Sequence, residues 1–217
     1  LLLGNSLEFV IILLAAADLG ATVVPMDSSI SNRDLFTAIN ATDIKYIIGQ
    51  NSILKKVFQN SQQGQNRFPL LRKSCIALGG HIEGCYSFSK IQETVSESYK
   101  LGVQSFDDEQ DFILTMTSGS TNDPKPIVFT QGTKISRCFN AQEVYKLTEE
   151  DRVLVATPLY HSISQRLIFV PLILGGTCVI MRTFNANKWF GQVSKNKITF
   201  TIAVASQLEA ILEQTIK

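Results

Sequence analysis

The stretch that decides the fold is Thr117-Ser118-Gly119-Ser120-Thr121-Asn122-Asp123-Pro124-Lys125. Apolar residues 112–114 precede it and apolar residues 127–129 follow it, so we expect a small polar loop between two strands. In such a loop, backbone N–H groups and hydroxyls can converge on phosphate oxygens, and Lys125 adds a positive charge at the far end. The stretch predicts a phosphate-binding loop formed by Thr117, Ser118, Gly119, Ser120, Thr121 and Lys125.

The same stretch has two other interpretations. A Walker-type P-loop requires a second glycine where Pro124 stands, a Ser or Thr where Pro126 stands, and a helix directly afterwards. The residues that follow are typical of a strand, so this class is disfavoured. The second interpretation is a solvated surface loop, because clusters of Ser, Thr, Gly, Asn and Pro are common in loops without function.

His161 is a second candidate. It follows Pro158-Leu159-Tyr160 at an expected strand-to-helix turn, a place where functional residues are often found. A histidine at such a turn can also cap the helix or belong to the core, and both alternatives stay open at this point.

The loop resembles the phosphate-binding signature of the adenylate-forming superfamily, which contains acyl-CoA synthetases, peptide-synthetase adenylation domains and luciferases. Further stretches resemble the same family in the same order, and they are spread from residue 3 to residue 181. They are residues 3–9 through 19–27, residues 147–154 with Thr157-Pro158-Leu159-Tyr160-His161-Ser162, and residues 174–181. Tyr160-His161-Ser162 is more similar to acyl-CoA synthetases than to peptide-synthetase domains.

The resemblance implies a function for the whole enzyme. It would use ATP and Mg²⁺ to join a small carboxylic acid to AMP, and would then pass the acyl group to a thiol, favoured here to be that of CoA. His161 would lie in the wall beside the acyl carboxylate and the α-phosphate. Residues 1–217 would form part of the large N-terminal domain, truncated at both ends and without the C-terminal lid domain. We therefore expect these residues alone not to catalyse.

The chain departs from the family pattern in the loop region. Asn122 and Pro126 stand where the family usually has glycine, and Gln131 stands where many members have histidine. Asn tolerates a left-handed backbone, whereas proline removes a donor. These changes leave two alternatives open: a non-catalytic binding or scaffold module that keeps the fold, and an amino-acid or aryl-acid adenylation domain that loads a carrier protein.

Composition limits the remaining classes. The chain has 217 residues, 45% of them hydrophobic, and a net charge of +1, so no basic surface for nucleic acid is expected. The four cysteines form no C-x-x-C pair, which favours free thiols in a reducing cytoplasm and no metal site. The apolar run over residues 9–17 is too short to span a membrane, for which about 20 residues are needed.

The order of predicted elements indicates an α/β fold, with αβα layers and mostly parallel sheets. Asn5 and Glu8 predict a capping box at the start of the first helix. A long helix is predicted over residues 132–146, with apolar Ile135, Phe139 and Val144 near one face. Strands are predicted over residues 21–25, 45–48 and 198–204, and a helix over residues 186–195.

Overall fold

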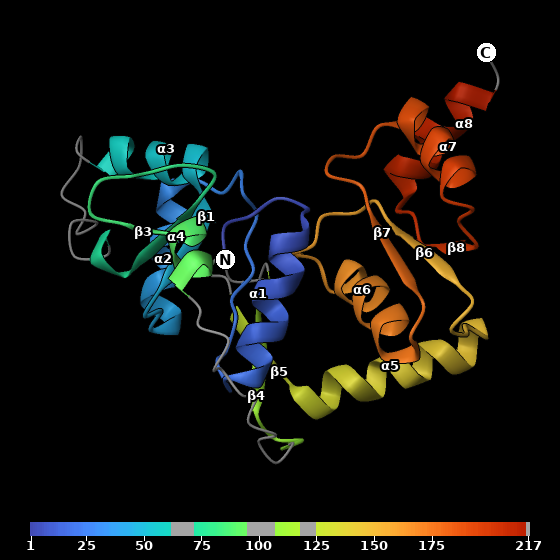
Figure 1. Ribbon diagram of the computed structural model, residues 1–217, viewed down its shortest axis with the longest axis horizontal. Coiled ribbons are helices and arrows are strands. Elements are labelled where there is room, and N and C mark those ends of the chain that lie inside the picture. Colours follow the sequence, from blue (N-terminus) through green and yellow to red (C-terminus); the bar gives the residue numbers. More distant parts are fainter. Residues whose placement is uncertain (62–71, 95–106, 118–124, 216–217) are drawn as a thin grey trace. The chain divides into compact units, whose positions relative to one another are not determined.

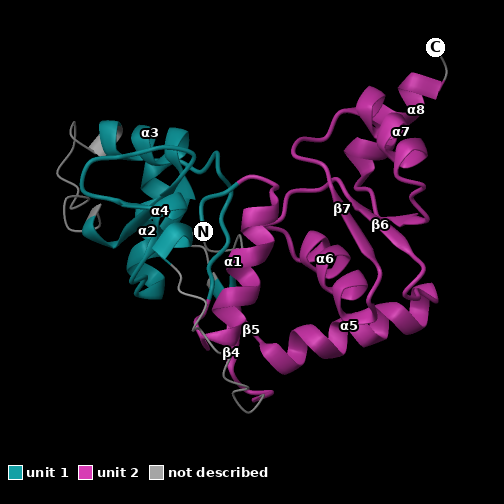
Figure 2. Ribbon diagram, in the orientation of Figure 1, with its two compact units in different colours: residues 1–3, 23–106, 114–128 teal, residues 4–22, 107–113, 129–217 magenta. Residues whose placement is uncertain are grey.

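The computed structural model describes residues 1–61, 72–94, 107–117 and 125–215. Its elements divide between two compact units, each built from separated stretches of the chain (Figure 2). Unit 1 comprises residues 1–3, 23–106 and 114–128, and unit 2 comprises residues 4–22, 107–113 and 129–217. Because the chain passes between the units several times, no linker in the sequence could have indicated the division.

Unit 1 contains a parallel sheet in the order β1-β2-β3. Ile47 pairs with Cys75 at one end of the β1–β2 ladder, and Leu2 adds a parallel bridge to Gly49. The helices and strands of this unit are α2 (Asn32–Thr42), β1 (Ile47–Gln50), α3 (Asn51–Ser61), a 3-10 turn η2 (Arg72–Ser74), β2 (Cys75–Leu78), β3 (Tyr86–Ser87) and α4 (Phe88–Thr94). Its core gathers Leu2, Leu35, Leu54, Phe58 and Cys75.

Unit 2 contains a second parallel sheet in the order β7-β6-β8. Its elements are α1 (Leu7–Asp18), α5 (Gln131–Tyr145), β6 (Arg152–Val155), α6 (Ser162–Leu174), β7 (Thr177–Ile180), α7 (Ala186–Lys195), β8 (Phe200–Thr201) and α8 (Ala205–Thr215). The strands β4 (Asp111–Thr117) and β5 (Lys125–Thr130) form a separate two-stranded sheet, and each contributes residues to both units.

Helices cover both faces of the β7-β6-β8 sheet (Figure 1). Alternate residues of β6 point to opposite faces, as strand geometry requires. Val153 lines a small apolar cavity with Leu167 of α6, whereas Leu154 belongs to a core cluster with Trp189 of α7. The predicted αβα layering with parallel strands is therefore confirmed.

The starts of several helices follow directly from the sequence. Ser31 caps α2 by accepting a hydrogen bond from the Asp34 amide, and Asn185 caps α7 through the Lys188 amide. The predicted cap of α1 is wrong, because Ser6 rather than Asn5 accepts the bond from Phe9. The Asn5 side chain instead donates hydrogen bonds to the carbonyls of Thr157 and Met181.

The apolar residues Phe139 and Val144, which the sequence places near one face of α5, do not lie in its buried stripe. Phe139 is 50% exposed and Val144 is 71% exposed, while Lys134, Cys138 and Ala141 are buried. These three residues are spaced four and three apart, so they form one stripe of the helix. Lys134 can occupy the stripe because its amine finds a buried hydrogen-bond partner on α6.

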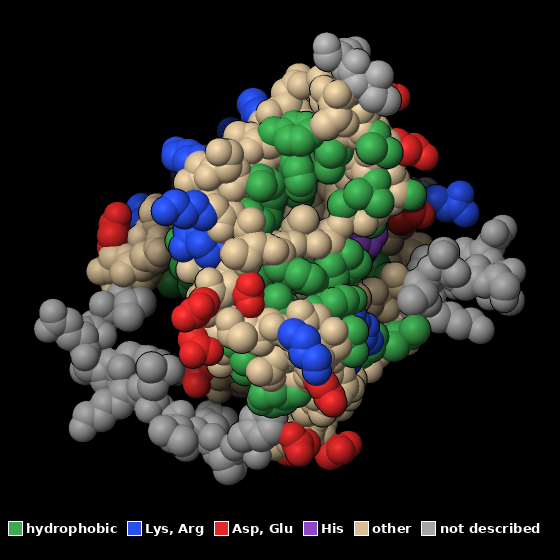
Figure 3. Space-filling view, turned by 90° about the vertical axis from the view of Figure 1, so that its right-hand side faces the viewer, with side chains coloured by type: hydrophobic (Ala, Val, Ile, Leu, Met, Phe, Trp, Pro, Cys, Tyr) green, Lys and Arg blue, Asp and Glu red, His purple; other side chains and the backbone are tan. Residues whose placement is uncertain are grey.

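Large apolar side chains remain exposed on several helices of unit 2, and Figure 3 shows hydrophobic side chains gathered on the face that it presents. Leu172 on α6 and Leu208 and Leu212 on α8 are between 44% and 59% exposed. Part of the apolar surface of these helices is therefore open to solvent.

Candidate functional site

The predicted phosphate loop is flanked by two hydrogen-bonded strands. Thr117 is the last residue of β4 and Lys125 is the first residue of β5. A connection between parallel neighbouring strands needs a dozen or more residues, and residues 118–124 are too few for it. The two strands therefore run antiparallel, and Thr117 and Lys125 lie at the same end of the pair. Ser118, Gly119, Ser120 and Thr121 lie outside the described residues.

The element after the loop is a strand, as the sequence predicts. Pro126 lies within β5 and is exposed, a position that suits a residue without an N–H donor. No helix begins at the end of the loop, and the arrangement required by a Walker-type P-loop is therefore absent at residues 125–130.

His161 lies at the N-terminus of α6. Its carbonyl oxygen accepts the amides of Ser164 and Gln165 at 3.1 and 3.2 Å, whereas its side chain makes no capping bond. The imidazole is exposed and its ring centroid lies 4.2 Å from that of Tyr160. His161 is therefore neither a capping side chain nor a core residue.

The turn before His161 is fixed by the side chain of Asn5. Its Nδ2 donates to the carbonyls of Thr157 and Met181, both at 2.9 Å, and its Oδ1 accepts the amide of Leu159 at 2.8 Å. All three bonds are buried, where leaving a polar group unpaired costs about 1–3 kcal/mol. One side chain thus joins the start of α1 to the ends of β6 and β7.

A second buried amide holds the other side of the same turn. Gln165 has no exposed surface, and its Nε2 donates to the carbonyls of Leu159 and Tyr160 at 3.4 and 3.3 Å. Its Oε1 accepts a 2.6 Å hydrogen bond from the Lys134 Nζ on α5. Lys134 therefore supports the residues next to His161 through Gln165.

Burial lowers the pKa of Lys134. Desolvation, followed by the nearby positive charge of Arg137, lowers its pKa from 10.5 to about 8. The amine also lies 4.4 Å from the centroid of the Phe129 ring, a distance at which a cation is attracted to an aromatic face.

The predicted site residues fall in two units. Thr117 and Lys125 belong to unit 1, whereas His161 and the groups that hold its turn belong to unit 2. Sequence reasoning missed Asn5, Gln165 and Lys134 as residues of the site. The sequence offers one signal for two of them, which is a polar residue close to apolar ones. Asn5 follows Leu1-Leu2-Leu3-Gly4, and Gln165 lies in a helix that is otherwise mostly apolar.

Within the described ranges, no group of three or more His, Cys, Asp or Glu side chains could hold a metal ion. None of the four cysteines is in a disulfide. No helix in the described part of the chain has the length and apolar character that crossing a membrane requires.

The fold and the site elements have counterparts in known proteins. The family model for AMP-binding enzymes matches residues 1–217, so the chain belongs to this family of adenylate-forming enzymes. A feruloyl-CoA synthase from Amycolatopsis sp. is 31% identical over 100 residues, which is 46% of this chain and 20% of that protein. The 2-succinylbenzoate–CoA ligase of Bacillus subtilis is 23% identical over 215 residues, 99% of this chain and 40% of the ligase.

Solved structures show the same fold. The inhibitor-bound N-terminal domain of FACL13 from Mycobacterium tuberculosis aligns with a TM-score of 0.84 and 19% identity, covering 96% of this chain and 50% of that one. The AMP complex of the Bacillus subtilis o-succinylbenzoate CoA synthetase aligns with a TM-score of 0.79 and 21% identity, covering 99% and 50%. The chain thus spans half or less of the length of each of these four proteins.

Proposed function

We propose that the full-length protein is an ATP-dependent acid–CoA ligase, which activates a carboxylic acid as its acyl-adenylate and transfers the acyl group to the thiol of CoA. The observation that carries the proposal is the family match over every residue of the chain. Relatives that align over nearly the whole chain are named as CoA ligases for 2-succinylbenzoate and oxalate.

In this proposal the 117–125 loop holds the ATP phosphates. Backbone amides of the loop, the hydroxyls of Thr117, Ser118, Ser120 and Thr121, and the Lys125 ammonium would neutralise the triphosphate. Gly119 would allow close approach of the backbone. Attack of a carboxylate on the α-phosphate brings negative charges together, so positioning and charge neutralisation are the main tasks of the protein.

His161 is assigned to the wall beside the reacting carboxylate. Its exposed imidazole, free of any capping role, is available to a ligand, and the Asn5 and Gln165 amides fix the turn that carries it. Rigid support of this kind is what a positioned catalytic group requires.

Mg²⁺ is part of the proposal for the full-length protein, where it would add positive charge at the phosphates. The described residues supply no acidic cluster for it, and we assign it no ligand in this chain.

The test is carboxylate-dependent exchange of labelled pyrophosphate into ATP by the full-length protein. The acids offered include ferulate, 2-succinylbenzoate and fatty acids of several lengths. At least one acid should support exchange, and Lys125→Ala and His161→Ala should each reduce it at least tenfold. His81→Ala is the matched control, because His81 is also an exposed histidine but lies in unit 1 beside Gly80.

The acceptor is tested separately. With an active acid, CoA should yield acyl-CoA that is detectable by mass spectrometry. Exchange without acyl-CoA would favour a carrier-protein thiol as the acceptor. Absence of exchange with every acid, in a protein that is folded, would favour a non-catalytic module.

A further inference from the structure

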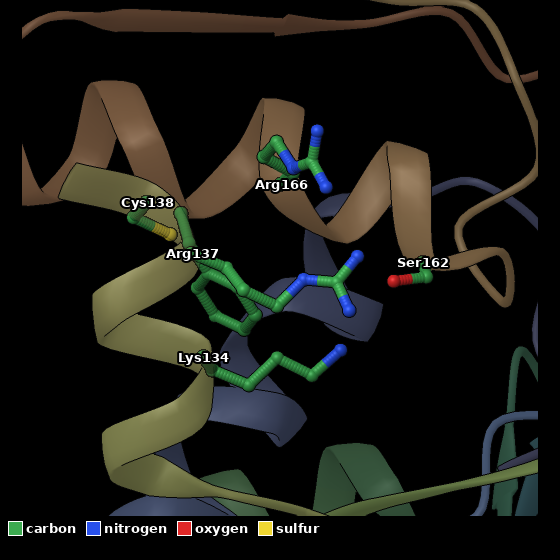
Figure 4. Close-up of a pocket in the computed structure, with 6 residues that line it drawn as sticks. Lys134, Arg137, Cys138, Ser162 and Arg166 are labelled. Carbon is green, nitrogen blue, oxygen red and sulfur yellow. The ribbon is translucent and has the colours of Figure 1, made fainter. Parts of the chain in front are cut away.

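A pocket between α5 and α6 is lined by three cationic side chains. Lys134 and Arg137 come from α5 and Arg166 comes from α6; Cys138, Ser162 and Phe169 complete the lining. The cavity measures about 10 Å³. Figure 4 shows the charged ends of the three cations on the same side, with the Ser162 hydroxyl directed toward them.

The neighbours of these cations are neutral. Lys134 is buried and bonds to the amide oxygen of Gln165, and both Lys134 and Arg137 lie over the ring of Phe129, at 4.4 and 5.2 Å from its centroid. Lys134, Arg137 and Arg166 form no ion pair within 4.0 Å with a described residue. No described carboxylate therefore compensates the charge of the pocket.

Two hydrogen-bonding groups in the same lining have no partner. Ser162 Oγ and Arg166 Nε are buried, and neither makes a hydrogen bond. Buried polar atoms in native proteins are nearly always paired, because an unpaired one loses its bonds to water without a replacement. The Ser162 hydroxyl, the Arg166 Nε–H and the three cationic side chains together form a group of hydrogen-bond donors that suits an anion.

The pKa of Lys134 reflects the positive charges that surround it. Burial is the largest cause that lowers its pKa, and the charges of Arg137 and Arg166 lower it further. A bound anion would oppose these charges, because an opposite charge within about 4–6 Å favours the charged form of an amine.

We propose that this pocket binds a small oxyanion, namely a carboxylate or phosphate group, through Arg137, Arg166, Lys134 and the Ser162 hydroxyl. Guanidinium groups match carboxylate and phosphate oxygens with parallel hydrogen bonds, which makes arginine well suited to this role. A cavity of about 10 Å³ is close to the space of one water molecule, so only the terminal oxygens of a ligand enter. None of the residues that line the pocket belongs to the proposed phosphate loop, residues 117–125.

The test is arginine side-chain NMR of the full-length protein, labelled with ¹⁵N-arginine and titrated with inorganic phosphate or with succinate. The Nε–Hε signal that is missing in Arg166→Gln identifies Arg166. This signal should shift saturably with at least one anion and stay unchanged in sodium chloride at equal ionic strength. A shift with phosphate alone identifies free phosphate as the source, and a shift with succinate alone identifies a carboxylate ligand.

Thermal unfolding provides a second readout, because a ligand that binds the native state raises Tm. The rise produced by the effective anion should be lost in Arg166→Gln and in Arg137→Gln. It should persist in Arg182→Gln, whose arginine is exposed in unit 2, and in Lys125→Ala, which tests the loop instead. The proposal is overturned if the Arg166 signal responds to neither anion, or if both pocket variants retain the full rise in Tm.

Discussion

The side-chain oxygen of Asn5 accepts a hydrogen bond of 2.8 Å from the backbone amide of Leu159, which is 154 positions away in the chain. The Nδ2 atom of Asn5 donates to the carbonyls of Thr157 and Met181. Asn5 therefore ties the turn before His161 to the ends of β6 and β7. The orientation of that turn depends on a residue far from it in sequence.

Asn5→Ala should lower the free energy of unfolding by about 3 kcal/mol, because it leaves two carbonyls and one amide buried without partners. Urea unfolding measures the loss. Asn187→Ala is the control, since Asn187 is exposed on α7, and it should change stability by less than about 0.5 kcal/mol. Equal effects of the two substitutions would contradict the role given to Asn5.

Lys134 should make stability rise with pH above neutrality. Its folded pKa of about 8 lies below the ordinary 10.5, so the unfolded chain binds more protons between these values and unfolding becomes less favourable as pH increases. Relative to Lys134→Met, the native protein should gain about 2 kcal/mol between pH 7 and 9.5.

The comparison with Lys134→Met removes the contribution of groups that titrate in this range independently of Lys134. Cys138, whose pKa burial raises to about 11, keeps its proton across the range in the folded state. Lys188→Met, at an exposed position of α7, should follow the native curve. Parallel curves for Lys134→Met and the native protein would show that Lys134 has an ordinary pKa.

Asp151 should stabilise the turn between α5 and β6 at neutral pH. Hydrogen bonds from the Thr199 hydroxyl and the Thr148 amide, both 2.7 Å, lower the pKa of its carboxyl group. The stabilisation is present above the unfolded pKa of 3.8 and is lost as pH falls through the lower folded value.

Asp151→Asn should therefore cost stability at pH 7 and cost less at pH 3, as measured by urea unfolding at both values. The loss at pH 7 should be below about 1 kcal/mol, because the group is partly exposed and screened by solvent. Glu150→Gln, a change at an exposed neighbour, should have no such pH dependence. A loss for Asp151→Asn that is the same at both pH values would disprove this account.

Two glycines in helices of unit 2 should respond oppositely to alanine. A Cβ at Gly132 would lie 2.8 Å from the Asp108 side chain and 2.9 Å from its carbonyl oxygen, whereas a Cβ at Gly191 meets nothing within 4 Å. Gly132→Ala should destabilise by about 1–3 kcal/mol through overpacking, while Gly191→Ala should stabilise by about 0.5–1 kcal/mol through helix propensity. Thermal unfolding of both variants tests this prediction. Changes in Tm of the same sign in the two variants would contradict it.

Much of the fold follows from the sequence because local signals decide it. The predicted bounds of α7 agree with the structure, since Asn185 caps the helix and Lys195 ends it. Strand ends are less predictable, because they depend on the partner strand. Residues 198–204 were expected to form a strand, but only Phe200 and Thr201 pair with β6. The expected strand over residues 21–25 is reduced to a single bridge at Val23.

The site is harder to predict, because its supporting contacts join residues that are far apart in the chain. Hydrophobicity singles out Phe139 on α5, yet the helix buries Lys134, whose partner Gln165 is 31 positions away. No local pattern reveals such a partner. The phosphate-loop prediction rests on residues 117–125, of which residues 118–124 lie outside the described ranges, and it stays a prediction.

The central claim is that the 117–125 loop binds the triphosphate of ATP. Isothermal titration of ATP into the full-length protein tests it most directly. We predict saturable binding with a micromolar to millimolar Kd, weakened at least tenfold in Lys125→Ala and unchanged in His81→Ala. Heat that stays flat through millimolar ATP, or equal affinity in Lys125→Ala, would contradict the claim.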